Sequence, residues 1–573
     1  MVTTVAPTRA TDTAVAPSEP RRAWRVPPHR RFAAAVLAAV LVGLALRIAI
    51  GLTDDAPATD ETAYLQSGVS LVEGDGFARL GSPETHFPPF VPLLLGLMSR
   101  VVDDPHTGTV ILTCLASTAL IVPLALLGRR VAGGRAGVAT AWVAALAPGV
   151  STSVVNRGAG SEAEYLVLAV GAVWFVVSAA DHRGRARLVR VGAGGLLVGL
   201  AYLTRPEGLF IAAPLGLTVL ALGWRAAGDR RRRQVSAGRL AAAFAVPIVA
   251  CIVPYAAYLH RHTGEWQLSA KNQDASIEAW HAVARADRQA RDSVLYALDE
   301  TGYGFAAGQS SLTRLAMDDP GGYAEIVRTN ASQLGDVIAR PETGRVLSWL
   351  LLPLPVWVLA ALGAWWHGRV LTMRVVLAVG ALPVATALAF FVQPRYLMLT
   401  TALATVPAGA AIVRFRGRWR PVIAAAVVVL LTLSAVQGFK GPGGWWHPSD
   451  HTDQRAAGEW LAENTVPDAR VMSRSMVVRY YADRPTMAIP YAGLEEIVEY
   501  GRHYGAQYLV ADWYTLRRLR PQLAPLREEE DVPGLRLVHK VRREGRTTRI
   551  YTFDPVSVVP DDIGPPLGFV GDS

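Results

Sequence analysis

Long apolar runs recur along most of the chain and limit what it can fold into. Many approach the length that a helix needs to cross a hydrocarbon core of about 30 Å, although several are short or interrupted by Gly or Pro. We therefore predict a polytopic α-helical membrane protein with about 11 transmembrane helices. The runs lie near 32–52, 108–128, 136–155, 163–180, 190–204, 207–224, 240–259, 346–366, 375–392, 396–413 and 421–437.

The composition supports this class of protein. The chain has 573 residues, of which 51% are hydrophobic and only 18% are charged, a combination that is rare in soluble proteins. Its two cysteines, Cys114 and Cys251, lie inside apolar runs, which excludes a disulfide scaffold and offers no metal or redox motif. The sequence has no Walker A loop and no GxGxxG after a strand, so nucleotide binding is unsupported.

The distribution of charge predicts how the helices run. The net charge is +10, yet six short segments hold 25 Arg and four acidic residues, which leaves a net −11 for the rest of the chain. Loops rich in Arg resist translocation, so we predict that these segments face the cytosol. Because the charge reports topology, we expect no nucleic-acid partner. The segments are 1–31, 129–135, 181–190, 225–239, 367–374 and 414–420.

This topology divides the chain into three parts. We predict a disordered basic cytosolic tail over 1–31, a transmembrane domain over 32–437 with outward loops 53–107 and 260–345, and an extracytoplasmic α/β domain over 438–573. The first apolar run is predicted to be a retained signal anchor. Arg supplies 54 of the 57 basic residues, as is typical of a GC-rich bacterial genome, so we expect the bacterial cytoplasmic membrane. In the last domain we predict helices over 453–464 and 494–504 and strands over 470–472, 507–511, 535–541 and 548–553.

The first outward loop contains the acidic pair Asp60 and Glu61, followed by Tyr64. Asp60 and Tyr64 are four residues apart and would share one face of a helix. A carboxylate at this position can act as a general base on an acceptor hydroxyl. A plainer explanation stays open: Thr59 caps a helix, and the two acids favour its positive end.

Further polar residues interrupt the apolar runs at their predicted outer ends. Glu162 begins an apolar run, where an unpaired carboxylate is costly, and Arg205 stands before Pro206 at a helix break. Arg395, next to Tyr396, suits a lipid phosphate through bidentate hydrogen bonds. Each has a plainer explanation, namely a helix cap, neutralisation by Glu207, or snorkelling to the interface. All of them nevertheless fall on one predicted face, which favours a cavity open to the outside.

These motifs together resemble the GT-C integral-membrane glycosyltransferases, and most closely the protein O-mannosyltransferase and aminoarabinose transferase type. The resemblance covers roughly residues 32–553. Each motif is loose, but their order and their spacing relative to the apolar runs are fairly specific. The motifs are Asp60-Glu61-x-x-Tyr64, Gly74-x-Gly76-Phe77, Pro88-Pro89, Ser161-Glu162, Thr204-Arg205-Pro206-Glu207-Gly208 and Arg395-Tyr396.

The resemblance implies a glycosyltransferase, either a hexosyl- or a pentosyltransferase, that moves a sugar from a polyprenyl-phosphate donor to an acceptor on the outer side, with inversion. It implies Asp60 as the catalytic base and Glu61 as its catalytic neighbour. A lipid phosphate is a competent leaving group if cations stabilise its charge. The substrate-binding residues that it implies are Tyr64, Glu162, Arg205, Arg395 and Tyr396.

No cofactor is assigned. Some relatives use a divalent metal, and His86, His260 and His262 could join Glu84 or Glu61, but no ligand spacing supports a metal site. The sugar and the acceptor, whether glycan, lipid or protein, are not identified by the sequence.

Two other classes of protein stay open. A lipid or solute transporter or flippase would place polar residues near the middle of the membrane and often has internal repeats. A noncatalytic scaffold would have dispensable loop acids.

Overall fold

The computed structural model describes most of the chain. The predicted tail 1–31 lies almost entirely outside the described residues, as do parts of the two outward loops. The described residues are 28–53, 57, 59–79, 82–151, 160–225, 230–271, 288–305, 312–339, 351–439, 451–528, 531–543 and 545–554.

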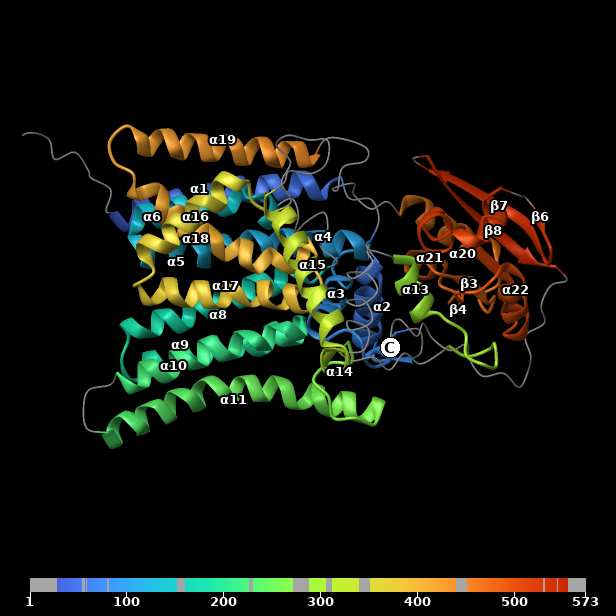
Figure 1. Ribbon diagram of the computed structural model, residues 1–573, viewed down its shortest axis with the longest axis horizontal. Helices are drawn as coiled ribbons and strands as arrows, with labels where there is room; N and C mark the ends of the chain where they lie inside the picture. The colour runs from blue at the N-terminus through green and yellow to red at the C-terminus, as the bar shows by residue number, and fades with distance from the viewer. Residues whose placement is uncertain are drawn as a thin grey trace, which may run out of the picture.

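A bundle of long apolar helices with roughly parallel axes forms the larger part of the molecule (Figure 1). In the described ranges, nine helical segments are long and apolar enough to cross a membrane, and every predicted run has a helix in it. The helices are α1 (Pro28–Gly51), α4 (Pro105–Ala119), α5 (Ile121–Ala132), α6 (Gly134–Leu146), α8 (Glu162–Ser178), α9 (Gly184–Thr204), α10 (Ala212–Trp224), α11 (Arg230–Thr263), α16 (Leu354–His367), α17 (Leu371–Ala389), α18 (Met398–Arg414) and α19 (Trp419–Phe439).

The described part of the chain thus has nine candidate spans, where about 11 were predicted. The two shorter helices are α6, with 13 residues, and α16, with 14. A proline lies at one end of each, where its ring removes a backbone hydrogen-bond donor. Pro148 opens a separate short turn after α6, and Pro353 directly precedes α16.

Helix α18 runs through the centre of the bundle. Its residues from Met398 to Ile412 are buried except for Thr400, which is partly exposed. Helix α16 crosses it closely at Gly363, where a Cβ atom would lie 1.9 Å from the carbonyl oxygen of Pro407. The short turn that precedes α18 is thereby attached to a deeply buried part of the bundle.

Arg47 is a charged residue within α1, and it is completely buried. Its guanidinium donates hydrogen bonds to Oγ of Ser117 at 3.0 Å and to the carbonyls of Gly43, Ala145 and Val150 at 2.9, 3.2 and 2.7 Å. An Arg inside a membrane span is tolerated when its donors are satisfied in this way. The contacts bind α1 to α4 and to the end of α6.

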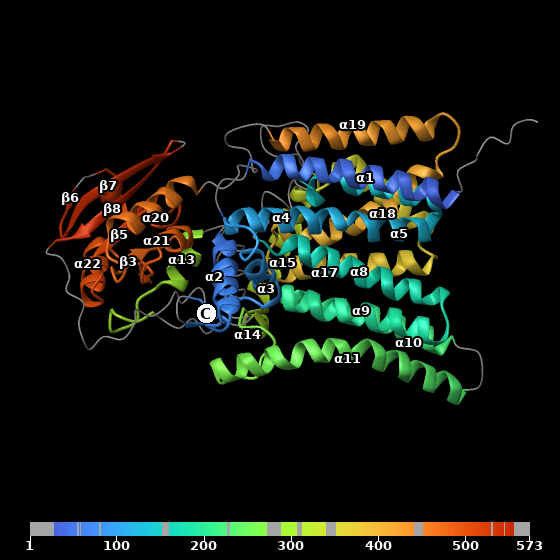
Figure 2. The same ribbon diagram turned by 180° about the vertical axis from the view of Figure 1, so that it is seen from behind.

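Short elements cover one end of the bundle, and α2 lies there across the axes of the long helices (Figures 1 and 2). Helix α2 packs tightly on α3, because Gly68 and Gly96 meet backbone to backbone: a Cβ on Gly96 would lie 2.1 Å from the carbonyl oxygen of Gly68. The elements are α2 (Thr59–Glu73), β1 (Ala78–Arg79), β2 (Ser82–Pro83), α3 (Phe90–Met98), α14 (Leu312–Asp318) and α15 (Pro320–Ala339).

The C-terminal residues form a separate α/β domain beyond this end of the bundle, which confirms the predicted fold class. Its six-stranded mixed sheet has the order β4-β3-β5-β8-β7-β6. Helices α20 and α21 pack on one face of the sheet, and α22 packs on the other. The elements are α20 (Thr452–Asn464), β3 (Val471–Ser473), α21 (Met476–Ala482), β4 (Thr486–Met487), α22 (Leu494–His503), β5 (Tyr508–Ala511), α23 (Pro525–Glu528), β6 (Asp531–Val532), β7 (Leu535–Arg543) and β8 (Arg546–Phe553).

Part of the second outward loop belongs to this domain. Helix α13 (Arg288–Leu295) carries Asp292, which is completely buried. Its Oδ2 lies 2.9 Å from Nη1 of Arg520, and its Oδ1 accepts a hydrogen bond from Nη2 of Arg474 at 3.1 Å. The domain also contacts the bundle end, where Met476 packs against Tyr64 and its neighbours in α2 and α3.

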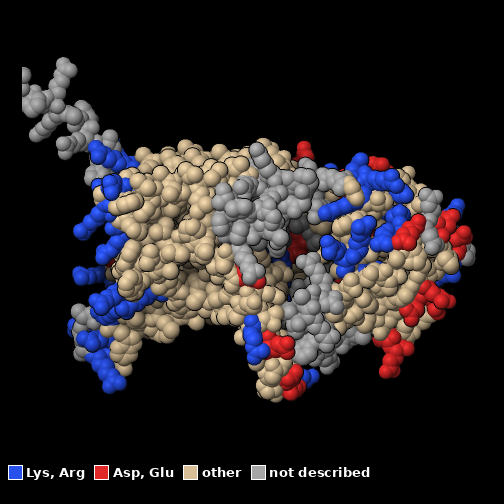
Figure 3. All heavy atoms as spheres, turned by 45° about the horizontal axis from the view of Figure 1, so that its top comes forward, with Lys and Arg blue, Asp and Glu red and all other residues tan. Residues whose placement is uncertain are grey.

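Arginines gather at the opposite end of the bundle (Figure 3). We call this the basic end; the end near the C-terminal domain is the domain end. Contacts at the basic end join several predicted cytosolic segments: Arg130 pairs with Asp181 and donates to Thr372, and Arg135 lines a hollow with Arg414.

Candidate active site

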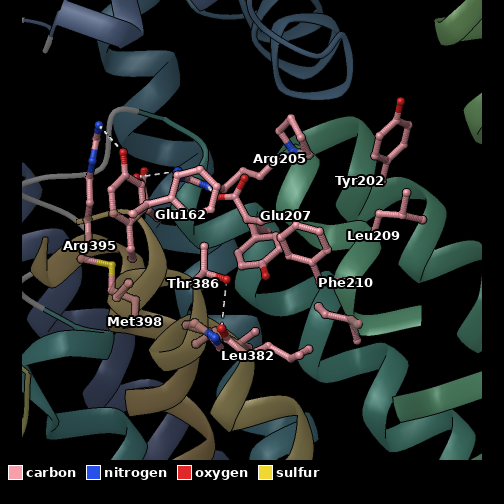
Figure 4. A pocket seen from close by; sticks show the side chains of 18 of the residues that line it. Glu162, Tyr202, Arg205, Glu207, Leu209, Phe210, Leu382, Thr386, Arg395 and Met398 are labelled. Atoms are coloured by element: carbon pink, nitrogen blue, oxygen red, sulfur yellow. Dashed lines mark hydrogen bonds and ion pairs between the residues drawn. The ribbon is translucent and has the colours of Figure 1, made fainter. Parts of the chain in front are cut away.

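A pocket of about 480 Å³ opens at the domain end of the bundle (Figure 4). Its walls come from α8, from the turn between α9 and α10, from α17 and from the turn before α18. Ser269 and Lys271, which follow α11, close one side. The pocket has a charged half and an apolar half, and each half follows from the elements that build it.

The apolar half lies between the short helix Pro206–Ile211 and α17. Phe210 and Leu382 face each other across it, and the 51% exposed Phe210 places its mouth at the bundle surface (Figure 4). A long apolar chain could therefore enter from the side of the bundle. The lining residues of this half are Leu166, Leu209, Phe210, Ile211, Leu382, Pro383, Ala387, Phe390, Phe391, Met398 and Leu399.

Arg205 is held at the helix break after α9. Pro206 starts the short helix Pro206–Ile211, which turns the chain back toward the pocket. Nη1 of Arg205 donates to Oε1 of Glu162 at 2.7 Å, and Nε donates to Oε1 of Glu207 at 2.7 Å. The predicted site residues Arg205 and Glu162 are thus direct partners, and Glu207 neutralises part of the same charge.

Arg395 lies on the other side of the charged half, in the short helix Pro394–Leu397. Its Nη1 donates to Oδ2 of Asp60 at 3.0 Å, and its Nη2 donates to the hydroxyl of Tyr396 at 3.2 Å. Gln393 accepts from Nε at 3.1 Å, which fixes the plane of the guanidinium. The side chains of Asp60 and Arg395 are 32% and 29% exposed, so both are accessible to a ligand.

Lys271 is a third cation of the pocket, and it was not predicted as a site residue. Its ammonium lies 4.3 Å from the centre of the Phe87 ring. Burial lowers the pKa of Lys271, and the nearby carboxylate of Asp60 offsets this only in part. The available signal was its rarity, since Lys271 is one of only three lysines in the chain.

Asp60 is kept ionised by these cations. Burial alone would raise the pKa of the Asp60 carboxyl group, but Arg395 and Lys271 more than offset it and hold the pKa below its usual value. A deprotonated carboxylate at the border of a pocket is the state that a general base needs.

Tyr64 and Tyr396 complete the group of predicted residues that the structure brings together. The hydroxyl of Tyr64 lies 3.3 Å from Oγ of Ser161, which also accepts a hydrogen bond from Arg205. The guanidinium carbon of Arg205 lies 5.6 Å from the centre of the Tyr396 ring. Tyr396 therefore contacts both arginines, and Tyr64 is connected to Arg205 through Ser161.

Glu61 is the one predicted site residue that lies outside this group. It is buried, and its Oε1 lies 2.7 Å from Nδ1 of His106 in α4. Neighbouring residues on a helix point about 100° apart, so Asp60 and Glu61 cannot both face the pocket. Glu61 instead connects α2 to the bundle.

The residues suggested as metal ligands do not come together. Within the described ranges, no group of three or more His, Cys, Asp or Glu residues is close enough to hold a metal ion. Glu84 accepts hydrogen bonds from the backbone of His86 and Phe87 and pairs with Arg79. The donor set at the pocket therefore does not fit a metal, and we derive no step through one.

Comparisons with known proteins agree with this architecture. Residues 86–255 match the family model of dolichyl-phosphate-mannose-protein mannosyltransferase. The archaeal oligosaccharyltransferase AglB from Archaeoglobus fulgidus is similar with a TM-score of 0.53 at 14% identity, over 85% of this chain and 70% of AglB. ArnT from Cupriavidus metallidurans gives a TM-score of 0.45 at 14% identity, over 93% of this chain and 99% of ArnT. No curated protein sequence matches the chain.

The fold and the pocket define a polytopic membrane protein with a C-terminal soluble domain and a charged site at the domain end. The match to the family model and the similarity to the fold of AglB confirm the resemblance to the GT-C integral-membrane glycosyltransferases that the sequence motifs indicate.

Proposed function

We propose that the protein is a glycosyltransferase that moves a sugar from a polyprenyl-phosphate carrier to an acceptor on the outer face of the bacterial cytoplasmic membrane. One observation carries the proposal: the cations Arg205, Lys271 and Arg395 meet an apolar channel that reaches the bundle surface in one pocket, and the Asp60 carboxylate pairs with Arg395 at its border. A polyprenyl phosphate has the matching parts, a long apolar chain and an anionic group at its end.

The phosphate of the donor would bind between Arg205, Lys271 and Arg395, with the prenyl chain along the apolar half of the pocket. Guanidinium groups bind phosphate oxygens bidentately, and fixed cations stabilise the charge that develops on a leaving phosphate. AglB, which shares the fold, has been described in complex with a dolichol phosphate.

Asp60 would act as the base. An acceptor hydroxyl loses its proton to the Asp60 carboxylate as its oxygen attacks the anomeric carbon, and the bond from that carbon to the phosphate oxygen breaks. The lipid phosphate leaves with the electron pair, and the configuration at the anomeric carbon inverts because one displacement occurs. A donor phosphate bound to Arg395 would compete with Asp60 for its guanidinium and so free the carboxylate.

Glu61 enters this proposal as a positioning residue rather than a catalytic one. Its buried contact with His106 fixes α2 on α4 and thereby fixes the place of Asp60.

The outward orientation of the pocket rests on the arginines. Arg-rich ends of membrane proteins stay in the cytosol, so the basic end would face the cytosol and the domain end the outside. The same distribution argues against a transporter, whose polar residues would line a path through the middle of the membrane. Here the charged pocket residues lie at the domain end, where Arg395 pairs with Asp60 of α2.

A transfer assay tests the proposal. The purified protein is supplied with polyprenyl phosphates that carry hexoses or pentoses, and with glycan, lipid and peptide acceptors. We expect transfer from at least one donor and a loss of about 10²- to 10⁴-fold in Asp60→Asn, the usual contribution of a general base. Asp75→Asn, an exposed acid of the same loop, is the matched control and should stay active. Full turnover by Asp60→Asn, or no transfer from any lipid-phosphate donor, would overturn the proposal.

A further inference from the structure

A second pocket, of about 290 Å³, lies in the C-terminal domain and is lined by residues of that domain alone. It lies between β8, the turn Thr515–Leu519 and α23, on the sheet face opposite α20. The register places Arg549 and Thr547 on this face, because their neighbours Thr548 and Ile550 point toward α20. Its lining residues are Trp513, Leu516, Arg517, Arg527, Glu528, Gly545, Thr547 and Arg549.

An indole ring between cations forms one wall of this pocket. The guanidinium carbon of Arg546 lies 4.9 Å from the centre of the Trp513 ring, and that of Arg517 lies 5.7 Å from it. The one carboxylate of the lining, Glu528, pairs with Arg527. The pocket thus combines a partly exposed aromatic surface with more positive than negative charge.

Cations face each other between β8, which lines the pocket, and its neighbour β7. Lys540 lies opposite Arg549, and Arg543 lies opposite Arg546. Like charges directly opposite on neighbouring strands destabilise a sheet. Nε of Arg549 is moreover buried without a hydrogen-bond partner, which adds a further cost. An anion bound in the pocket would offset the repulsion between the cations and would give the Arg549 Nε a hydrogen-bond acceptor.

Topology does not account for this charge. Cytosolic retention explains the arginines of the basic end, but the C-terminal domain lies at the other end of the bundle (Figure 3). The part of the chain outside the six basic segments has a net charge of −11, yet residues 535–549 contain six basic residues and one acid, Glu544. A basic surface in an otherwise acidic part of the chain indicates an anionic partner.

We propose that this pocket binds an acidic glycan, a sugar polymer that carries carboxylate or phosphate groups, as the acceptor polymer of the enzyme. The guanidinium groups of Arg517 and Arg549 suit both anions, and the face of Trp513 suits the C–H face of a sugar ring. This inference rests on the proposed function, because the domain must lie outside the cell to meet such a polymer.

The composition of the surface favours a glycan over a lipid surface. A hairpin that docks on a membrane exposes large apolar side chains for insertion. Among the described residues of the domain, the exposed large hydrophobic residues are Val466 and Val538, and neither lines the pocket.

Binding of the detergent-purified full chain to defined polymers tests the inference. The probes are polygalacturonate for carboxylates, a phosphomannan for phosphates, dextran as the neutral polymer, inorganic phosphate, and vesicles that contain phosphatidylglycerol. We expect binding to at least one acidic polymer, weaker binding as salt rises, and no binding to dextran. The affinity should fall at least tenfold in Arg517→Gln, in Trp513→Ala and in the double variant Arg517→Gln/Arg549→Gln.

Arg536→Gln is the matched control, because Arg536 is an exposed cation of the same strand pair that faces away from the pocket. It should bind within twofold of the unmodified protein. Thermal unfolding of each variant shows whether the domain is folded. If the double variant does not fold, Arg517→Gln, which changes an exposed residue, still tests the inference.

Equal binding by Arg517→Gln and the unmodified protein would overturn the inference, as would equal binding to dextran. Stronger binding to the vesicles than to either polymer would show that the surface docks on a membrane instead. Binding of inorganic phosphate alone would show that the pocket is a small-anion site instead. Binding needs no sugar donor, so Asp60→Asn should bind the polymer normally. A failure of this inference is therefore distinct from a failure of the proposed transferase.

Discussion

Nη1 of Arg395 lies 3.0 Å from Oδ2 of Asp60, although 335 residues separate them in the chain. Asp60 comes from α2, which lies across the domain end, and Arg395 comes from the turn before the central helix α18. The pair therefore joins the loop 53–107, which is predicted to face outward, to the most buried part of the bundle. In the proposed reaction it also joins the base to the donor phosphate.

The pH dependence of transfer should report this pair. A base acts only when deprotonated, so activity falls as the pH drops through the pKa of Asp60. Burial raises that pKa, but Arg395 and Lys271 hold it below the usual value of an Asp. In Arg395→Gln one positive charge is gone, so the pKa rises and the acid limb of kcat/KM moves to higher pH. Arg261→Gln, which removes an exposed cation at the end of α11, should leave the limb in place. If the acid limb of Arg395→Gln stays at the same pH, Asp60 is not the base whose protonation the limb reports.

Lys271 should contribute to donor binding. Removal of one charged partner of a phosphate costs about 1.5–3 kcal/mol, so Lys271→Gln should raise the KM for the lipid donor about 10- to 100-fold. Lys271→Arg keeps the charge and should restore most of the affinity. Steady-state kinetics with a fixed acceptor measure both variants, again with Arg261→Gln as control. A normal donor KM in Lys271→Gln would exclude the ammonium from the phosphate site.

Local patterns predicted the helices well, because hydropathy and length decide which segments can cross a membrane. They also put Glu162 and Arg205 at the same predicted end of their apolar runs, although the contact between the two was not predicted. Hydropathy did not indicate where α6 and α16 end or begin, beside Pro148 and Pro353.

The rest of the site depends on contacts that no local pattern contains. Lys271 reaches the pocket because the chain after α11 folds back over it, and the sequence nearby has no periodicity that indicates this. Asp60 and Glu61 look equivalent in the sequence, and only the packing of α2 on α4 decides that Glu61 meets His106. Residues that act through long-range contacts were therefore the ones missed or misassigned to the pocket.

The contact between α13 and the C-terminal domain should be a major source of stability for that domain. Asp292 and Arg520 are both completely buried, and loss of one partner leaves the other charge unpaired. Such a loss costs about 3–5 kcal/mol, so Asp292→Asn should clearly lower the unfolding temperature of the domain. Glu300→Gln changes an exposed acid of the same segment and should have little effect. Equal unfolding temperatures for the two variants would show that the contact adds no stability.

The apolar half of the pocket should set the length of prenyl chain that the protein accepts. Leu382 lines this half from α17, and a larger side chain there would fill the space between α17 and the short helix Pro206–Ile211. We expect Leu382→Trp to raise the KM for a donor with a long prenyl chain at least tenfold, and to affect a donor with one or two prenyl units much less. Leu377→Trp is the matched control, because Leu377 is 41% exposed on the same helix and does not line the pocket. If both donors lose affinity equally in Leu382→Trp, the chain does not follow this channel and the variant has disturbed the site in general.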